Sequence, residues 1–341
     1  MYLRRSLWLV ALTLFMTLCG MKYGVAADDP IRVVLSDDSP AVSLKGRTFE
    51  KFAEALRSRL GRRIELRVHH SGTLFGQTSQ IQGLQLGGAS FIAPTTATYA
   101  SVSPAINVLS LPFLLDTPEK YAAAVSDPLI RSAFVPALER KNIEPLAFWM
   151  NGPRVLGYRG QREVLTPQDA GGLKIRIQSS PVFVRTLEAM GANPTGLAWG
   201  ETPTALQQGV IDGAEVTPNA WKSTGMDEFI DHLTLTNHML SYYMVSTDKS
   251  WWDGLPEDVR HDIQAALSTA TGWNAAEAQL MNDRDVQAMA DEGVVVHRLD
   301  TVQRQQWANA MKPVWSDLGG GLVSKAVLDR LREISEDVAS H

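Results

Sequence analysis

Two arginines in the middle of the chain are the residues best suited to bind an anion. Arg176 lies in the segment 173–178, where apolar and polar residues alternate as in a β-strand with one buried face. A partly buried guanidinium is costly unless it pairs with an anion, and its planar set of donors matches a carboxylate. On the sequence alone, the partner of Arg176 is either a bound acid or an internal one such as Glu215 or Asp212.

Arg154 raises the same question beside Asn151-Gly-Pro, where the chain is expected to cross between two lobes. The simpler alternative there is an exposed arginine in a turn. Trp149 and Trp199 lie near the two arginines in sequence and offer large apolar surfaces to a ligand. Packing in the core is the alternative for each tryptophan.

The sequence lacks the short motifs that mark common catalytic and nucleotide-binding sites. It contains no G-x-S-x-G, no Walker loop, no G-x-G-x-x-G and no H-E-x-x-H. His69 and His70 are adjacent on a predicted strand, so their side chains point to opposite faces and cannot share a metal ion. Asp37 and Asp38 are also adjacent and are expected in a solvated loop. We therefore expect a binding site with no catalytic residues, no metal and no cofactor.

The elements predicted around these residues favour an α/β protein with two lobes. The apolar run 31–35 and the alternating run 64–68 are predicted strands, and 48–60 between them is a predicted helix with one buried face. Such a unit forms a parallel strand pair with a right-handed crossover. The pattern that begins at Pro256 is helical for about 35 residues, or roughly 50 Å. A helix of that length exceeds one small lobe and can brace two.

The chain divides into an export signal and two lobes. Residues 1–27 carry two arginines, an apolar run of 13 residues and then small residues before Asp28, as in a signal peptide. That run is shorter than the roughly 20 residues needed to span a bilayer. We predict lobe 1 over 28–152, with a returning segment at about 240–270. Lobe 2 is predicted over 153–239, completed by about 271–341, and the lobes are joined by strands because no loose linker is present.

Composition narrows the class of protein. Removal of residues 1–27 lowers Lys plus Arg from 32 to 29 against 37 acidic residues, and it removes Cys19, the only cysteine. An acidic chain without basic runs argues against nucleic-acid binding. A chain without cysteine has no disulfides or catalytic thiol and relies on a hydrophobic core. We expect the mature protein to be soluble. The export signal predicts a periplasmic location, and we expect a monomer.

A series of motifs runs along the chain in a fixed order. It comprises Ser71-Gly-Thr-Leu-Phe-Gly, Leu109-Ser-Leu-Pro-Phe-Leu-Leu, Trp149-Met-Asn-Gly-Pro-Arg, Gly172-Leu-Lys-Ile-Arg-Ile-Gln-Ser-Ser-Pro-Val-Phe, Leu187-Glu-Ala-Met-Gly-Ala-Asn-Pro, Gly200-Glu-Thr-Pro-Thr-Ala-Leu-Gln-Gln-Gly-Val-Ile-Asp-Gly-Ala-Glu, Leu233-Thr-Leu-Thr-Asn-His and Trp252-Asp-Gly-Leu-Pro. No single motif is decisive, but in this order and spacing they closely resemble the TRAP transporter solute-binding proteins of the DctP type. The resemblance covers nearly all of residues 31–335.

The resemblance implies a fold and a function. The fold is the two-lobed α/β fold of periplasmic binding proteins, type II-like, with mixed sheets, hinge strands and a long helix spanning both lobes. The function is capture of a small organic acid and its delivery to the small and large membrane subunits of a sodium-coupled TRAP transporter. A binding protein for an ABC importer or a sensor kinase is the alternative, and an exported enzyme acting on organic acids is a third hypothesis.

The resemblance also implies roles for individual residues. Arg176 matches the arginine that forms a salt bridge with the ligand carboxylate, Arg154 a second arginine that often reaches the ligand, and Trp199 a residue that lines the cleft. The remaining candidate ligand contacts are Trp149, Asn151, Val216 and Asn219.

Three departures from the family pattern bear on the ligand. Val216 stands where the family usually has an asparagine, Pro203 replaces a tyrosine, and the segment 78–82 lacks the usual acidic residues. The carboxylate anchor is retained. Val216 together with Trp199 suggests a ligand body less polar than a sugar acid.

Overall fold

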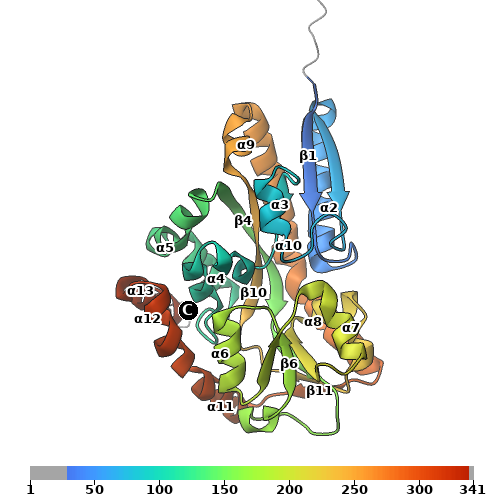
Figure 1. Ribbon diagram of the computed structural model, residues 1–341, viewed down its shortest axis with the longest axis vertical. Helices are drawn as coiled ribbons and strands as arrows, with labels where there is room; N and C mark the ends of the chain where they lie inside the picture. Colours follow the sequence, from blue (N-terminus) through green and yellow to red (C-terminus); the bar gives the residue numbers. More distant parts are fainter. Residues whose placement is uncertain (1–28, 338–341) are drawn as a thin grey trace, which may run out of the picture.

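The computed structural model describes residues 29–337, which form two lobes, each built on a mixed β-sheet (Figure 1). This confirms the predicted two-lobed α/β fold. The predicted export signal, residues 1–27, lies outside the described residues. Within residues 29–337, no helix has both the length and the apolar character that a membrane crossing requires.

The sheet of lobe 1 has five strands in the order β2-β1-β3-β10-β4. The strands are β1 (Ile31–Ser36), β2 (Ile64–His69), β3 (Phe91–Ile92), β4 (Ile143–Pro153) and β10 (Leu240–Asp248). β1 and β2 are parallel, with Ile31 opposite Ile64, and helix α2 (Leu44–Leu60) connects them, as predicted. The Ser43 side chain caps α2 by accepting from the Gly46 N–H. The helix therefore starts one turn before the predicted residue 48.

The sheet of lobe 2 has six strands in the order β11-β9-β5-β8-β6-β7. They are β5 (Val155–Tyr158), β6 (Lys174–Ile177), β7 (Asn193–Gly196), β8 (Gly213–Val216), β9 (His232–Leu235) and β11 (Val295–Arg298). The remaining α-helices of residues 29–337 are α3 (Gln80–Gln85), α4 (Pro118–Ser126), α5 (Pro128–Glu139), α6 (Pro181–Ala189), α7 (Thr202–Gln207), α8 (Pro218–Ser223), α9 (Lys249–Gly254), α10 (Glu257–Asp291), α11 (Thr301–Met311), α12 (Gly320–Leu322) and α13 (Lys325–Asp337).

Two long antiparallel strands join the lobes. β4 and β10 pair from Ile143 opposite Asp248 to Pro153 opposite Leu240. Along the chain, β4 leads into β5 of lobe 2, and β10 follows β9 of lobe 2. Gly152 sits at this crossing with φ of +134°, and a Cβ there would lie 2.4 Å from the Asn282 amide nitrogen. A side chain at this position would combine backbone strain with a steric clash.

Helix α10 contacts both lobes, as the sequence predicted from the length of its helical pattern. It packs against α2 and β4 in lobe 1 and against α8 in lobe 2. Its buried asparagines hold the backbone of β4: Asn274 accepts from the Met150 N–H at 2.6 Å and donates to the Met150 carbonyl at 3.0 Å, and Asn282 donates to the Asn151 carbonyl at 2.9 Å. Buried backbone groups need such partners, so these asparagines fix the strand to the helix.

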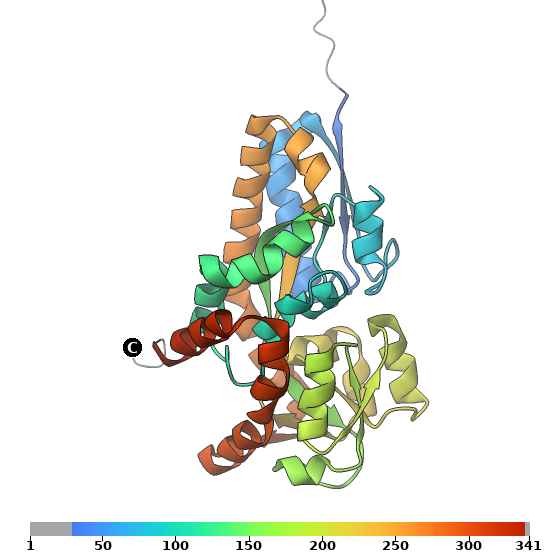
Figure 2. The same cartoon turned by 60° about the vertical axis from the view of Figure 1, so that its left-hand side comes forward.

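The C-terminal segment differs from the prediction, which assigned residues 271–341 to lobe 2. α11 does pack against α6 of lobe 2, but α13 returns to lobe 1 and packs against α4 and α5. Figure 2 shows this red segment climbing from one lobe to the other. Arg330 of α13 pairs with Asp127 at 2.8 Å. The apolar face of α13, with Leu328 and Leu331, is buried on lobe 1, so packing rather than chain order decides its place.

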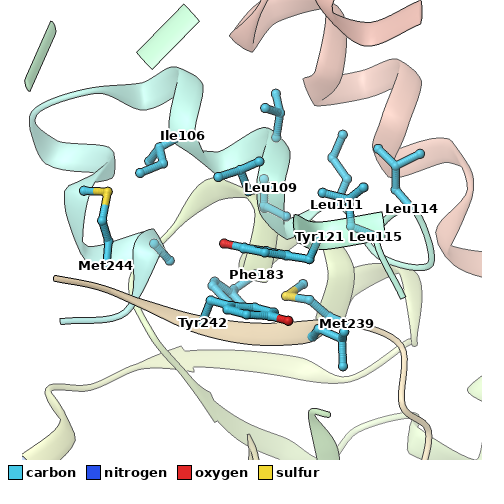
Figure 3. Packing of buried hydrophobic residues seen from close by; sticks show 14 of the residues in the cluster. Ile106, Leu109, Leu111, Leu114, Leu115, Tyr121, Phe183, Met239, Tyr242 and Met244 are labelled. Carbon is cyan, nitrogen blue, oxygen red and sulfur yellow. The ribbon is translucent and has the colours of Figure 1, made fainter. Parts of the chain in front are cut away.

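A continuous apolar cluster extends across the connection between the lobes (Figure 3). Tyr121 of α4 stacks on Tyr242 of β10 with ring centroids 3.6 Å apart. Met239 and Phe183 of α6 belong to the same cluster. One face of the strands that join the lobes therefore packs against this apolar cluster.

Candidate ligand-binding site

A cavity of about 500 Å³, including its mouth, lies between the lobes. It is lined by Asp38, Ser39, Ser43, Lys45, Gln77, Thr95, Asn151, Arg154, Arg176, Gln178, Trp199, Val216, Asn219, Ala220, Ser223 and Tyr243. Six of the seven predicted site residues are among them, and the seventh, Trp149, is not.

The topology of both sheets explains why these residues meet. Asp38 follows the carboxyl end of β1, and Thr95 follows that of the parallel strand β3. In lobe 2, Gln178 follows the carboxyl end of β6, and Val216 ends the parallel strand β8. Ligands in open α/β sheets bind at the carboxyl ends of strands, and here two such edges face each other.

Arg176 is buried, with 2% of its surface exposed, and has no internal acid as partner. Its Nε and Nη2 donate to the Leu197 carbonyl at 3.1 and 2.8 Å, and Nη2 also donates to Gln77 Oε1 at 3.2 Å. No carboxylate within residues 29–337 forms a salt bridge with it, and none of these residues accepts from Nη1. Of the two internal partners considered from the sequence, Asp212 accepts from the Lys174 N–H and Glu215 pairs with Arg154.

The electrostatic state of Arg176 reflects this lack of an anion. Burial, and secondarily the positive charge of Arg154, lowers the pKa of Arg176 to about 9. Its guanidinium carbon lies 5.4 Å from the centre of the Trp199 ring, which supplies a cation–π contact but no negative charge. The cavity therefore contains a guanidinium whose buried charge a bound anion would stabilise.

Arg154 is buried too, at 3% exposure, which excludes the exposed turn considered from the sequence. Its Nε and Nη2 donate to the Glu215 carboxylate, the latter at 2.7 Å, and its guanidinium lies over the Phe183 ring at 4.6 Å. Burial opposes ionisation of Glu215, but Arg154 and His238 outweigh it and keep the pKa of that carboxyl below its usual value. The charge of Arg154 is thus neutralised from within the protein.

Trp149 lies in the core of lobe 1 and does not line the cavity. Core packing was the alternative that the sequence left open for this residue. It is fully buried, meets Phe49 edge-on at 5.1 Å and donates from Nε1 to Thr271 at 3.0 Å. Register changes at this point, since Met150 pairs with Tyr242 whereas Gly152 pairs with Ser241. The bulge explains why Trp149 and Asn151 face different surroundings although they are two residues apart.

Lobe 1 contributes a charged cluster that the sequence reasoning missed. Lys45 of α2 is buried and pairs with Asp37 at 3.2 Å and, more closely, with Asp38. These aspartates are 1% and 9% exposed, so the prediction of a solvated loop was wrong. His70 bonds Asp37 and Glu50, both at 2.9 Å. The sequence predicted that this helix begins at residue 48, so Lys45 was not recognised as part of its first turn.

The pKa values of this cluster follow from its contacts. Burial acts against a charged Lys45, but Asp38 and Asp37 outweigh it and raise the pKa of the ammonium above its usual value. The hydrogen bond to Asp37 likewise raises the pKa of His70. Lys45 is therefore a cation whose charge is already matched by carboxylates.

Polar contacts cross the cavity and hold the lobes together. Gln77 of lobe 1 accepts from Arg176 and, at 3.0 Å, from the Trp199 N–H. Gln178 of lobe 2 meets two threonines of lobe 1 at 2.6 and 2.7 Å, and Asn219 accepts from the Leu44 N–H at 2.8 Å. The structure therefore shows the lobes closed on one another. Only the position of Gln77 after the Ser71-Gly turn motif could have indicated its role.

The lining is more polar than the sequence suggested. The expectation of a less polar ligand body rested on Val216 and Trp199 alone. In the structure these two side chains are surrounded by hydroxyl, amide and charged groups from both lobes. Such a lining favours a ligand that has several hydrogen-bonding groups.

The chain is similar to known binding proteins over most of its length. The family model of the bacterial extracellular solute-binding proteins, family 7 (DctP), matches residues 35–319. The C4-dicarboxylate-binding periplasmic protein DctP of Vibrio cholerae is 32% identical over 272 residues, which cover 77% of this chain and 79% of that protein.

Solved structures agree with the fold. A TRAP periplasmic solute-binding protein from Shewanella oneidensis with bound succinate superposes with a TM-score of 0.84 at 28% identity, covering 90% of this chain and 99% of that one. A TRAP periplasmic solute-binding protein from Chromohalobacter salexigens with bound D-glucuronate gives 0.80 at 26% identity, covering 89% and 99%.

Proposed function

The chain belongs to the family 7 bacterial extracellular solute-binding proteins, of the DctP type, and we propose that it captures a small organic acid in the periplasm for a TRAP transporter. The proposal rests on the buried and unpaired state of Arg176 in the cavity. Its guanidinium lines the cavity, is almost fully buried, and has no carboxylate partner among residues 29–337. A carboxylate from outside supplies the missing charge.

The energetics of this contact are sufficient for an anchor. Hydrogen bonds to charged groups contribute about 1.5–3 kcal/mol each. The two N–H groups of Arg176 Nη1 that remain without an acceptor therefore supply roughly 3–6 kcal/mol. A micromolar ligand needs about −8 kcal/mol in total. Contacts with Trp199 and the polar lining make up the difference and offset the ordering cost.

Closure of the lobes is the proposed signal to the transporter. The ligand would contact side chains of both lobes and so favour the closed arrangement over an open one. Bending at the β4 and β10 strands would separate the lobes for release. The two membrane subunits then receive the acid from the closed protein. In this role the chain binds and releases its ligand without chemical change, and it uses no metal or cofactor.

The proposal is tested with a thermal-shift screen of carboxylic acids on the mature protein, because a ligand that binds only the folded state raises the melting temperature. Calorimetry on the best acid should show at least a tenfold loss of affinity in Arg176→Lys and Arg176→Ala. Arg185→Lys, a half-exposed arginine of α6, is the matched control and should bind normally. Undiminished affinity in both Arg176 variants would remove this residue from the site and refute the capture mechanism.

Delivery needs a separate test. Proteoliposomes that contain both TRAP membrane subunits should take up the acid only when this protein and an inward sodium gradient are present. Uptake that instead requires ATP hydrolysis by an importer would identify the alternative partner, an ABC system.

A further inference from the structure

The lobe 1 side of the cavity carries more negative than positive charge. Lys45 is its one cation among the described lining residues, and both Asp37 and Asp38 pair with it. Behind them, His70 is held between Asp37 and Glu50. The carboxylates of this cluster therefore outweigh the positive charge of Lys45, which disfavours a further anion on this side.

Asp38 has an oxygen that lacks a donor. Its side chain is 6% exposed, and Oδ1 accepts from the Lys45 ammonium. In the part of the chain that the structure describes, no group donates to Oδ2, and this atom is not among the fully enclosed polar atoms without a partner. Asp38 lines the cavity. A nearly buried carboxylate oxygen of this kind requires a hydrogen-bond donor.

The lobe 2 side has the opposite requirement. Glu215 neutralises Arg154, which leaves Arg176 as the arginine of the lining that has no salt-bridge partner among residues 29–337. The Arg176 guanidinium and the Asp38 carboxylate both line the cavity, one from each lobe. Among the described residues of the lining, Arg176 thus offers a positive group without a carboxylate partner, and Asp38 offers a carboxylate oxygen without a donor.

We infer that the ligand is a monocarboxylate with a hydrogen-bond donor, either a hydroxyl or an ammonium group, at the end that faces Asp38. This inference rests on the proposed function, because it assumes that a carboxylate occupies Arg176. A dicarboxylate in the same position would bring its second negative charge to Asp38, where low polarity strengthens the repulsion. Asp38 is then the residue that discriminates between the two classes of acid.

The first test uses the wild-type protein and acids of equal chain length. Calorimetry compares succinate with 4-hydroxybutyrate and 4-aminobutyrate, and glutarate with 5-hydroxyvalerate and 5-aminovalerate. We expect the hydroxy or amino acid to bind at least tenfold more tightly than the dicarboxylate of its own length. The hydroxyl and amino members of each set show which donor Asp38 accepts from.

The second test removes the charge of Asp38. Asp38→Asn keeps the shape of the side chain, and the preference for the monocarboxylate over the dicarboxylate should fall at least tenfold. Glu50→Gln is the matched control: it neutralises a half-exposed carboxylate of the same network that does not line the cavity, so the preference should stay within twofold. Equal unfolding curves show that both variants are folded.

The outcomes separate this inference from the proposed function. A dicarboxylate that binds wild type as tightly as its monocarboxylate partners, and loses affinity in Arg176→Lys, overturns the inference and leaves carboxylate capture intact. An unchanged preference in Asp38→Asn also overturns it. If no acid of either class binds, carboxylate capture itself fails, and the inference fails with it.

Discussion

Replacing Glu215 by glutamine should destabilise the protein strongly, because it leaves a buried arginine without its counter-charge. Glu215 is fully buried, accepts two hydrogen bonds from the Arg154 side chain, and lies 3.1 Å from His238 Nε2. Glutamine has nearly the same shape, so the variant changes charge and hydrogen bonding with little change in volume. Arg154 is only 3% exposed, so solvent cannot replace the counter-charge that Glu215 supplies.

The expected loss is about 3–5 kcal/mol, the usual effect of removing one partner of a buried ion pair. Total stabilities of folded proteins are about 5–15 kcal/mol, so this is a large fraction. Removing both charges together, in Arg154→Met with Glu215→Gln, should cost less than the sum of the two single changes. The reason is that most of the single-variant loss comes from the charge left behind.

The measurement is urea unfolding of the ligand-free protein at pH 7, followed by tryptophan fluorescence. Glu188→Gln, a half-exposed carboxylate on α6, is the control and should change the unfolding free energy by less than about 0.5 kcal/mol. A loss below about 1 kcal/mol in Glu215→Gln would refute the reasoning, as would single-variant losses that simply add in the double variant.

The same variant bears on ligand choice. Without Glu215, the charge of Arg154 is unopposed and adds to that of Arg176 at the cavity. The affinity for dicarboxylates should therefore rise relative to monocarboxylates of the same length, as measured by calorimetry on the folded fraction. An unchanged ratio would show that Arg154 is too far from the bound acid to influence it.

Two further predictions concern lobe 1. The pKa of His70 is raised by its hydrogen bond to Asp37, so its contribution to stability is complete below the unfolded pKa of about 6.5 and is lost as pH rises through the folded value. Wild type should therefore lose unfolding free energy above pH 6.5, and His70→Gln should lose less; identical pH profiles would contradict this. Trp149→Phe should cost about 1–3 kcal/mol, since it loses core volume and the hydrogen bond to Thr271, but ligand affinity should not change. A weakened affinity at equal stability would place Trp149 in the site after all.

Much of the fold was predictable because it depends on local patterns. Alternation over 64–68 and the helical period over 48–60 predicted a parallel strand pair, which β1 and β2 form. The long pattern after Pro256 predicted a helix that spans both lobes, and α10 runs from Glu257 to Asp291. These features follow from the spacing of apolar residues, which must face a core whatever the remaining chain does.

The pairing of charges was not predictable. The sequence offered Glu215 and Asp212 as internal partners of Arg176, beside a bound acid, but could not decide between them. Only the sheet register, which sets Leu156 of β5 opposite Glu215 of β8, brings Arg154 to this acid and leaves Arg176 without one. Ion pairing depends on distances across strands that are distant in sequence, and local pattern contains no record of them.

The sequence by itself determined that a strand of lobe 2 carries a guanidinium among apolar neighbours, where an anion is needed. Tertiary structure alone decided which acids were already engaged, that α13 returns to lobe 1, and that Asp38 and Lys45 face Arg176 across the cavity. The physical reason is that burial and neighbouring charge, which set the state of every ionisable group here, arise only when separate segments pack together.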